Sequence, residues 1–132
     1  MTYKILNLPQ IIDERGNLTF LQKGNVIPFD IQRVYWTYNA PGGETRGGHA
    51  YREQQELIVA VSGSFDVVLT DKHGNTEIIP LNRGYKGIYI PAGIWRHLEN
   101  FSTNAVSLHL SSTIFDNGDY IRDFQEYKEF TI

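Results

Sequence analysis

Cysteine is absent from this sequence of 132 residues, which excludes disulfide bonds, thiolate metal sites and a cysteine nucleophile. Long apolar runs are absent as well. The N-terminal segment MTYKILNLPQIIDERG carries charges at Lys4, Asp13, Glu14 and Arg15, and it lacks the continuous apolar stretch of a signal peptide or a membrane helix. We therefore expect a cytoplasmic protein with no membrane partner.

Charge of one sign is not concentrated anywhere in the chain. Twelve basic and 15 acidic residues give a formal net charge of −3, spread without long runs. Affinity for nucleic acid depends largely on neutralising phosphates with basic side chains, so we expect no nucleic-acid partner. A single phosphorylated small molecule needs only a few arginines and remains compatible with this composition.

Short apolar and β-branched runs, separated by turn residues, fill most of the chain. This rhythm is typical of an all-β sandwich or barrel, and the length suits one domain over residues 1–132. The end of the chain departs from the pattern, because Tyr120, Phe124 and Tyr127 follow the plausible N-cap Asp116 at helical spacing. We predict a short C-terminal helix over about 117–129, in which these aromatic side chains pack rather than form a site. The runs cover residues 17–21, 33–38, 56–61, 64–70, 76–79, 87–90 and 105–110.

The segment AVSLHLSS alternates between an apolar face and a polar face. Ser107, His109 and Ser111 share the polar one. On a surface strand this face would contact water, whereas in a small barrel it would point His109 into a polar interior cavity. The pattern leaves both interpretations open.

Two motifs carry the residues most suited to chemistry. GETRGGHAYREQQELIVAVSG has a glycine, five residues, His49, one residue, Tyr51, four residues, Glu56, six residues and a glycine. This spacing resembles the first signature of the cupin superfamily, in which the position of Tyr51 is usually a second histidine. PAGIWRHLEN resembles the second signature, with Arg96 in the position of its histidine.

The two replacements argue against a metal site. In metal-dependent cupins the two replaced histidines bind the ion together with His49 and Glu56, since imidazole and carboxylate suit divalent transition metals. A guanidinium is permanently charged and has no lone pair to donate, so Arg96 would repel a metal ion. We predict no metal and no cofactor. Arg96 suits an anionic ligand instead, or else a structural ion pair with Glu56.

Beyond the cupin signatures, four segments resemble the FdtA/QdtA-type, or WxcM-like, sugar 3,4-ketoisomerases: IPFDIQRVYW, RGGHAYREQQELIVAVSGSFDVVLTD, IPAGIWRHLENF and FDNGDYIRDFQEY. The resemblance implies a metal-free cupin barrel (a double-stranded β-helix or jelly-roll), largely antiparallel, which forms homodimers, often by exchange of N-terminal strands, here about residues 3–30. The implied activity moves a ketone from C4 to C3 of dTDP-4-keto-6-deoxyglucose or a similar nucleotide sugar, through an enediol, for deoxy- and amino-sugar biosynthesis (lipopolysaccharide, O-antigen or S-layer).

The same resemblance suggests site residues. His49 matches the first member of the family's His-x-His pair, and Tyr51 departs from the second. Arg46 matches the arginine before two glycines. These three are the predicted catalytic residues. The predicted substrate-binding residues are Tyr35, Arg33, Trp95, Arg96, Arg15 and His97.

The chemistry explains these residue types. A proton on carbon beside a ketone can be removed only if the resulting enediolate is stabilised, so the site needs a base and donors to oxygen. His49 can titrate near neutrality and is the predicted base, with Arg46 and Tyr51 holding oxygens.

The returning proton needs an acid. His49 itself could supply it, or Tyr51, if a neighbouring Arg46 or Arg96 lowers its phenol pKa from about 10. His97 and His109 are further candidates, although strand parity places His97 opposite Arg96. A second hypothesis is a non-catalytic nucleotide-sugar-binding module, since Tyr51 replaces a histidine. A third is a metal-dependent cupin enzyme.

Overall fold

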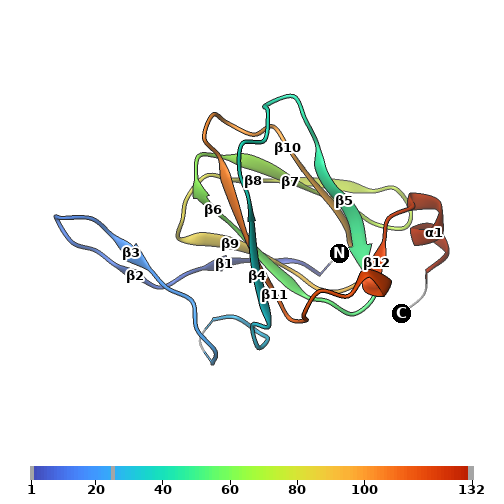
Figure 1. The fold of residues 1–132 in the computed structure, drawn as a ribbon, viewed down its shortest axis with the longest axis horizontal. Helices are drawn as coiled ribbons and strands as arrows, with labels where there is room; N and C mark the ends of the chain where they lie inside the picture. Colours follow the sequence, from blue (N-terminus) through green and yellow to red (C-terminus); the bar gives the residue numbers. More distant parts are fainter. Residues whose placement is uncertain (1, 25, 131–132) are drawn as a thin grey trace.

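The computed structural model describes residues 2–24 and 26–130; residues 1, 25, 131 and 132 of the predicted domain lie outside them. The described chain is nearly all β, as expected from the sequence (Figure 1). Its elements are β1 (Lys4–Asn7), β2 (Gln10–Ile11), β3 (Leu18–Thr19), β4 (Arg33–Thr37), β5 (Arg46–Tyr51), β6 (Glu56–Ser62), β7 (Phe65–Thr70), β8 (Thr76–Leu81), β9 (Lys86–Ile90), β10 (Trp95–Glu99), β11 (Val106–Ser111), a 3₁₀ turn (Asn117–Asp119), β12 (Tyr120–Ile121) and α1 (Phe124–Glu129).

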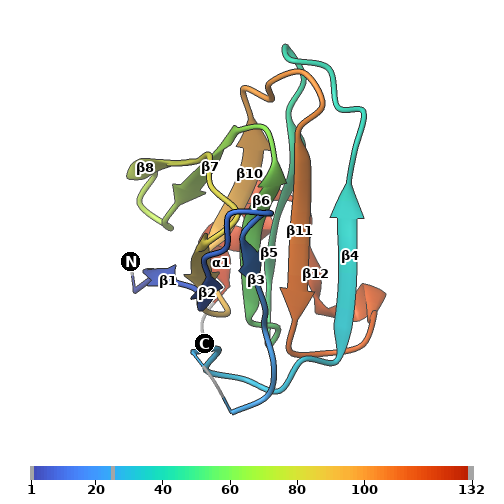
Figure 2. The same ribbon diagram turned by 90° about the vertical axis from the view of Figure 1, so that its left-hand side faces the viewer.

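Two five-stranded sheets form the body of the molecule. One has the order β1-β9-β6-β11-β4, and the other has the order β12-β5-β10-β7-β8. Every strand pair is antiparallel, which confirms that part of the expectation. The β2–β3 hairpin projects from this body (Figure 1), and Figure 2 shows β4 and β11 side by side at one edge.

The main core lies between the sheets. Ile58 and Ile88 from the first sheet are fully buried against Val67 and Leu69 from the second. A smaller cluster on the outer side of the first sheet includes Leu57, Val59 and Leu110 with residues of the N-terminal segment. Strand β6 is therefore covered on both faces. No helix in residues 2–24 and 26–130 is long and apolar enough to cross a membrane.

Strand β11 turns its polar face inward. Ser107, His109 and Ser111 are almost completely buried, while Leu110 packs on the opposite side of the sheet. The interior interpretation of this strand is therefore confirmed, and the surface interpretation is wrong.

The predicted helix over 117–129 is wrong in its first half. Asp116 caps only the 3₁₀ turn, where its Oδ1 accepts a hydrogen bond from the N–H of Gly118. The carboxylate of Asp119 then accepts from the backbone N–H groups of Glu53 and Gln54, at 2.8 and 3.1 Å. These bonds tie the segment to the end of β5, so the backbone continues as strand β12 and Tyr120 pairs with Tyr51 instead of lying on a helix.

Two separate glycines, one in the turn between β6 and β7 and one in the turn between β7 and β8, offer a test of the first turn. Gly63 has a φ of +64°, and a Cβ there would lie 2.9 Å from the Cα of Ala105; Gly74 has a φ of +84° and open space around it. We expect Gly74→Ala to cost about 1–2 kcal/mol from the backbone conformation alone. Gly63→Ala should cost about 1–3 kcal/mol more because of overpacking. Urea unfolding of both variants measures the difference, and equal losses would contradict this account of the turn.

Candidate active site

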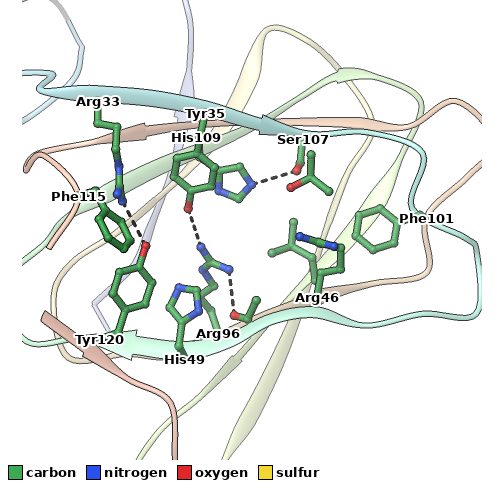
Figure 3. Close-up of a pocket in the computed structure, with 13 residues that line it drawn as sticks. Arg33, Tyr35, Arg46, His49, Arg96, Phe101, Ser107, His109, Phe115 and Tyr120 are labelled. Atoms are coloured by element: carbon green, nitrogen blue, oxygen red, sulfur yellow. Dashed lines mark hydrogen bonds between the residues drawn. The ribbon is translucent and has the colours of Figure 1, made fainter. Parts of the chain in front are cut away.

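A cavity of about 310 Å³ opens between the two sheets (Figure 3). One wall comes from β4 and β11, and the facing wall comes from β5 and β10. Strand alternation explains the inward side chains of β4, β10 and β11, and a register shift in the β5–β10 ladder lets both Arg46 and His49 of β5 line the cavity. The lining residues are Arg33, Tyr35, Thr37, Arg46, Gly47, His49, Arg96, Leu98, Phe101, Ser107, His109, Phe115 and Tyr120.

A buried ion pair lies at the base of the cavity. Arg96 donates from Nε to Oε1 of Glu56 at 2.6 Å and from Nη2 to Oε2 at 3.2 Å. It also donates to the carbonyl of Gly47 at 2.9 Å and to the hydroxyl of Tyr35 at 3.0 Å. These four bonds leave one of the five guanidinium N–H donors for a ligand. The ion-pair alternative for Arg96 is therefore confirmed.

Both members of the pair stay charged. Burial by itself would raise the pKa of Glu56, but the attraction of Arg96 outweighs it and holds that pKa well below its usual range. Burial would likewise lower the pKa of Arg96, and Glu56 raises it instead. Removing one partner of such a pair typically costs about 3–5 kcal/mol, because the other charge is left buried and unpaired.

Gly47 makes room for the guanidinium. It has a φ of +70°, and a Cβ at this position would collide with Nη1 of Arg96. The first glycine of RGGH is thus required by the close approach of Arg96 to the backbone of β5.

His49 lies beside this pair, directly opposite Arg96 in the β5–β10 ladder. Its ring makes edge contacts with the rings of Tyr51 and Tyr120, at centroid distances of 4.8 and 4.9 Å. Its Nε2 is buried and has no hydrogen-bond partner among the residues that the structure describes. Burial and the positive charge of Arg96 lower the pKa of His49 to about 3. The ring, which lines the cavity, is therefore neutral near pH 7, and the expected titration near neutrality is wrong.

Tyr51 is buried behind the cavity rather than exposed in it. Its hydroxyl lies 3.4 Å from the hydroxyl of Tyr35, and its ring contacts Tyr120 at 4.8 Å. Burial and the nearby Glu56 raise the pKa of Tyr51, although Arg96 acts in the opposite direction. Arg96 therefore does act to lower this pKa, as suggested, but burial and Glu56 outweigh it and the net pKa is raised. Tyr51 remains a neutral phenol.

The opposite wall carries Tyr35 and His109, which are cross-strand neighbours in β4 and β11. Their rings stack at 4.4 Å with an angle of 7° between the planes. Burial and Glu56 raise the pKa of Tyr35 to about 12. Tyr35 therefore stays protonated and acts as a hydrogen-bonding group.

Two arginines line different parts of the cavity, with Arg33 near Tyr120 and Arg46 near Phe101 (Figure 3). Arg33 donates to Oε1 of Gln54 at 3.0 Å and to the hydroxyl of Tyr120 at 3.4 Å. The sequence patterns did not identify Phe101 or Tyr120 as site residues. Tyr120 had a detectable signal only as part of a helix face, and the pairing of β12 with β5 is what brings it to the cavity.

Three predicted substrate-binding residues lie outside this cavity. Alternation along β10 points Arg96 inward and Trp95 and His97 outward. Trp95 contacts the ring of Phe124 at 5.2 Å, and Nε2 of His97 lies 2.7 Å from Oε1 of Glu99. Arg15 is on the β2–β3 hairpin, where it pairs with Asp13 at 2.9 Å.

No three histidine, cysteine or acidic residues in the described chain are grouped closely enough to hold a metal ion. The carboxylate of Glu56 is already bound to Arg96. The residues present therefore do not form the ligand set of a metal-dependent cupin.

Residues 1–131 match the protein family described as FdtA: WxcM-like, C-terminal. The chain belongs to this family.

Relatives of this FdtA-family chain resemble it over nearly its whole length. TDP-4-oxo-6-deoxy-alpha-D-glucose-3,4-oxoisomerase of Aneurinibacillus thermoaerophilus is 35% identical, covering 98% of this chain and 93% of the relative. The WlaRB TDP-quinovose 3,4-ketoisomerase of Campylobacter jejuni has a TM-score of 0.91 and 39% identity, covering 98% of each chain. A mutant of the 3,4-ketoisomerase QdtA from Thermoanaerobacterium thermosaccharolyticum, in complex with TDP-4-keto-6-deoxyglucose, has a TM-score of 0.93 and 31% identity, covering 96% of this chain and 91% of QdtA.

The lowered pKa of His49 makes a testable contribution to stability. The unfolded ring has a pKa of about 6.5, and the folded ring has a pKa of about 3. The fold favours the neutral ring, so this contribution is complete above pH 6.5 and is lost as the pH falls towards 3. Between pH 6 and 4 the wild type should lose up to about 1.4 kcal/mol per pH unit more than His49→Asn. Urea unfolding across this range measures it; parallel curves for the two proteins would refute the shift.

Proposed function

We propose that this protein is a sugar 3,4-ketoisomerase that acts on a dTDP-linked 4-keto-6-deoxyhexose and moves the ketone from C4 to C3. The observation that carries the proposal is the neutral imidazole of His49 in a cavity lined by arginines, with no hydrogen-bond partner for its Nε2 among the residues that the structure describes. The oxoisomerase of Aneurinibacillus thermoaerophilus and the QdtA complex with TDP-4-keto-6-deoxyglucose support this activity and substrate class. The product would enter deoxy- or amino-sugar biosynthesis.

In the proposed first step, the neutral imidazole of His49 removes the proton from C3 of the sugar. The electron pair of the C–H bond forms the C3–C4 double bond, and the negative charge moves to the oxygen on C4. Arg46, on the same strand as His49, and the remaining N–H of Arg96 can donate to sugar oxygens and stabilise the enediolate. The imidazolium that forms is buried beside Arg96, which favours its loss of the proton.

In the proposed second step, this proton returns to C4 and the ketone forms at C3. His49 can serve both steps, as base and then as acid, because it faces the same cavity throughout. Tyr51 supports the ring of His49 by packing against it and takes no proton. Replacement of the family's second histidine by Tyr51 is therefore compatible with turnover.

The cavity, at about 310 Å³, suits the sugar better than a whole nucleotide sugar. We infer that the sugar enters the space between the sheets and that the nucleotide lies towards its mouth. We expect Arg33, which lines this cavity, to bind a phosphate.

We further propose that the two sheets form the closed barrel of a cupin and that the protein works in the cytoplasm as a homodimer. Ile11 and Leu18, on the projecting β2–β3 hairpin, and Val34, on the outer side of the first sheet, are exposed apolar residues. Such patches mark contact surfaces. Exchange of the hairpins would cover them and carry Arg15 to the partner subunit.

His49→Asn tests the activity. Incubation with dTDP-4-keto-6-deoxyglucose in deuterated water, followed by NMR, should show a migrated ketone and deuterium at C3 or C4 for the wild type. The variant should lose at least about 100-fold in kcat, the usual contribution of a positioned base, and keep the Kd for TDP within about threefold, since His49 is assigned to the chemistry rather than to the nucleotide.

Tyr51→His is the companion variant, because it restores the histidine usual in the family. If the wild type binds TDP without turnover and Tyr51→His becomes active, the protein is a binding module and the isomerase proposal is wrong. If the wild type shows neither deuterium label nor ketone migration, the isomerase proposal is also wrong.

Ile11→Glu combined with Leu18→Glu tests the dimer. Two buried carboxylates would be costly in an interface, so the double variant should sediment as a monomer while the wild type sediments as a dimer. Ile78→Glu is the control, because Ile78 is similarly exposed on β8 in the other sheet and should leave the dimer intact. A monomeric wild type at micromolar concentration would overturn this part of the proposal.

A further inference from the structure

Ser107 and His109 of β11, on the cavity wall, form a series of buried groups with Glu56 of β6 behind them. The Oγ of Ser107 lies 2.9 Å from Nε2 of His109. On the other side of the ring, Nδ1 of His109 lies 3.6 Å from Oε2 of Glu56, a charge contact longer than a hydrogen bond. The three side chains are 1%, 2% and 1% exposed. A hydroxyl, an imidazole and a carboxylate thus follow one another, with the hydroxyl at the cavity.

The backbone fixes this order. Ser107 and His109 are two residues apart on β11, so both face the cavity (Figure 3). Stacking on Tyr35 holds the plane of the His109 ring, and Glu56 is held in turn by Arg96. The imidazole therefore has little freedom to turn away from either neighbour.

The surroundings of His109 favour one tautomer. The carboxylate near Nδ1 favours a proton on that nitrogen, which leaves the lone pair on Nε2 to accept from the hydroxyl of Ser107. Burial lowers the pKa of His109, so the ring is neutral before substrate binds. The lone pairs of the Ser107 oxygen are then free to accept a hydrogen bond from a hydroxyl in the cavity.

The proposed isomerisation needs a second proton transfer besides the one at carbon. The C3 hydroxyl loses its proton when it becomes a ketone, and the oxygen on C4 gains one. Tyr35 is poorly placed to take this proton, because its hydroxyl accepts from Arg96 and contacts Tyr51 and Glu56 at 3.4 Å. His49 belongs to the facing wall, on β5, and is occupied by the carbon-bound proton.

We propose that Ser107 and His109 carry the hydroxyl proton of the substrate from the oxygen on C3 to the oxygen on C4, while His49 carries the carbon-bound proton. This inference rests on the proposed ketoisomerase function. Ser107 takes the proton from the C3 hydroxyl as it passes its own to Nε2 of His109. His109 then returns a proton to Ser107, which gives one to the oxygen on C4, so both side chains end as they began. Ser107 touches the substrate, and His109 acts through it.

Two variants test the relay. Ser107→Ala removes the hydroxyl. His109→Gln keeps an amide that can bond to Ser107 but cannot take up a proton. Both should lose at least about tenfold in kcat, towards the lower end of what a positioned proton-transfer group contributes, and both should keep the Kd for TDP within about threefold. In deuterated water, exchange of the C3 proton in the remaining substrate should become faster relative to ketone migration, because His49 is intact. Ser62→Ala and His73→Gln, at exposed positions outside the cavity, are matched controls expected to retain wild-type kcat.

Three outcomes would overturn the inference. If kcat of Ser107→Ala is within threefold of the wild type, the hydroxyl is not needed. If His109→Gln is that active, the histidine is only a hydrogen-bond partner. If exchange and migration fall together in Ser107→Ala, the change is structural. A variant that does not fold leaves the other to decide. If the wild type is active but the variants contradict the relay, the ketoisomerase function still stands. A wild type that neither exchanges the C3 proton nor isomerises the substrate overturns both proposals.

Discussion

The ion pair between Arg96 and Glu56 is the contact on which the candidate site depends. Arg96 comes from one sheet and Glu56 from the other, so the pair joins the two layers through the interior. A buried ion pair is favourable only when nearly all of its hydrogen-bonding groups have partners. Here Gly47 and Tyr35 accept hydrogen bonds from guanidinium N–H groups that Glu56 does not bind. The position of β5 against β10, and hence the position of His49, follows from this requirement.

The same pair gives the cavity its electrostatic character. The positive charge of Arg96 and burial keep His49 neutral, so that in the proposed reaction it can act as the base without a change of pH. The negative charge of Glu56 raises the pKa of Tyr35 and lies close to His109. One wall thus carries a neutral imidazole, and the other carries hydroxyl groups backed by a second imidazole. In the proposed reaction this division assigns the carbon-bound proton to one wall and the hydroxyl proton to the other.

Strand positions were predictable because alternation is a local property of the sequence. Strands β4, β6, β7, β9 and β11 lie where the apolar runs indicated, whereas the antiparallel arrangement was expected only from the family resemblance. The C-terminal helix was predicted too long, since aromatic residues at helical spacing also fit a strand followed by a short helix. Hydrogen bonds from Asp119 to the backbone after β5 selected the second arrangement, and no pattern within residues 117–129 contains that information.

By itself, the sequence determined which groups were available: His49 after a glycine pair, an arginine where cupins place a metal-binding histidine, and a strand with one polar face. It also determined that Trp95 and His97 share a face opposite to Arg96, since side chains alternate along a strand. Only the tertiary structure decided which charges neutralise each other, that Tyr120 reaches the cavity, and that burial raises the pKa of Tyr51 and lowers that of His49. The reason is physical: a pKa depends on burial and on charges from strands distant in sequence, and these are set when the two sheets come together.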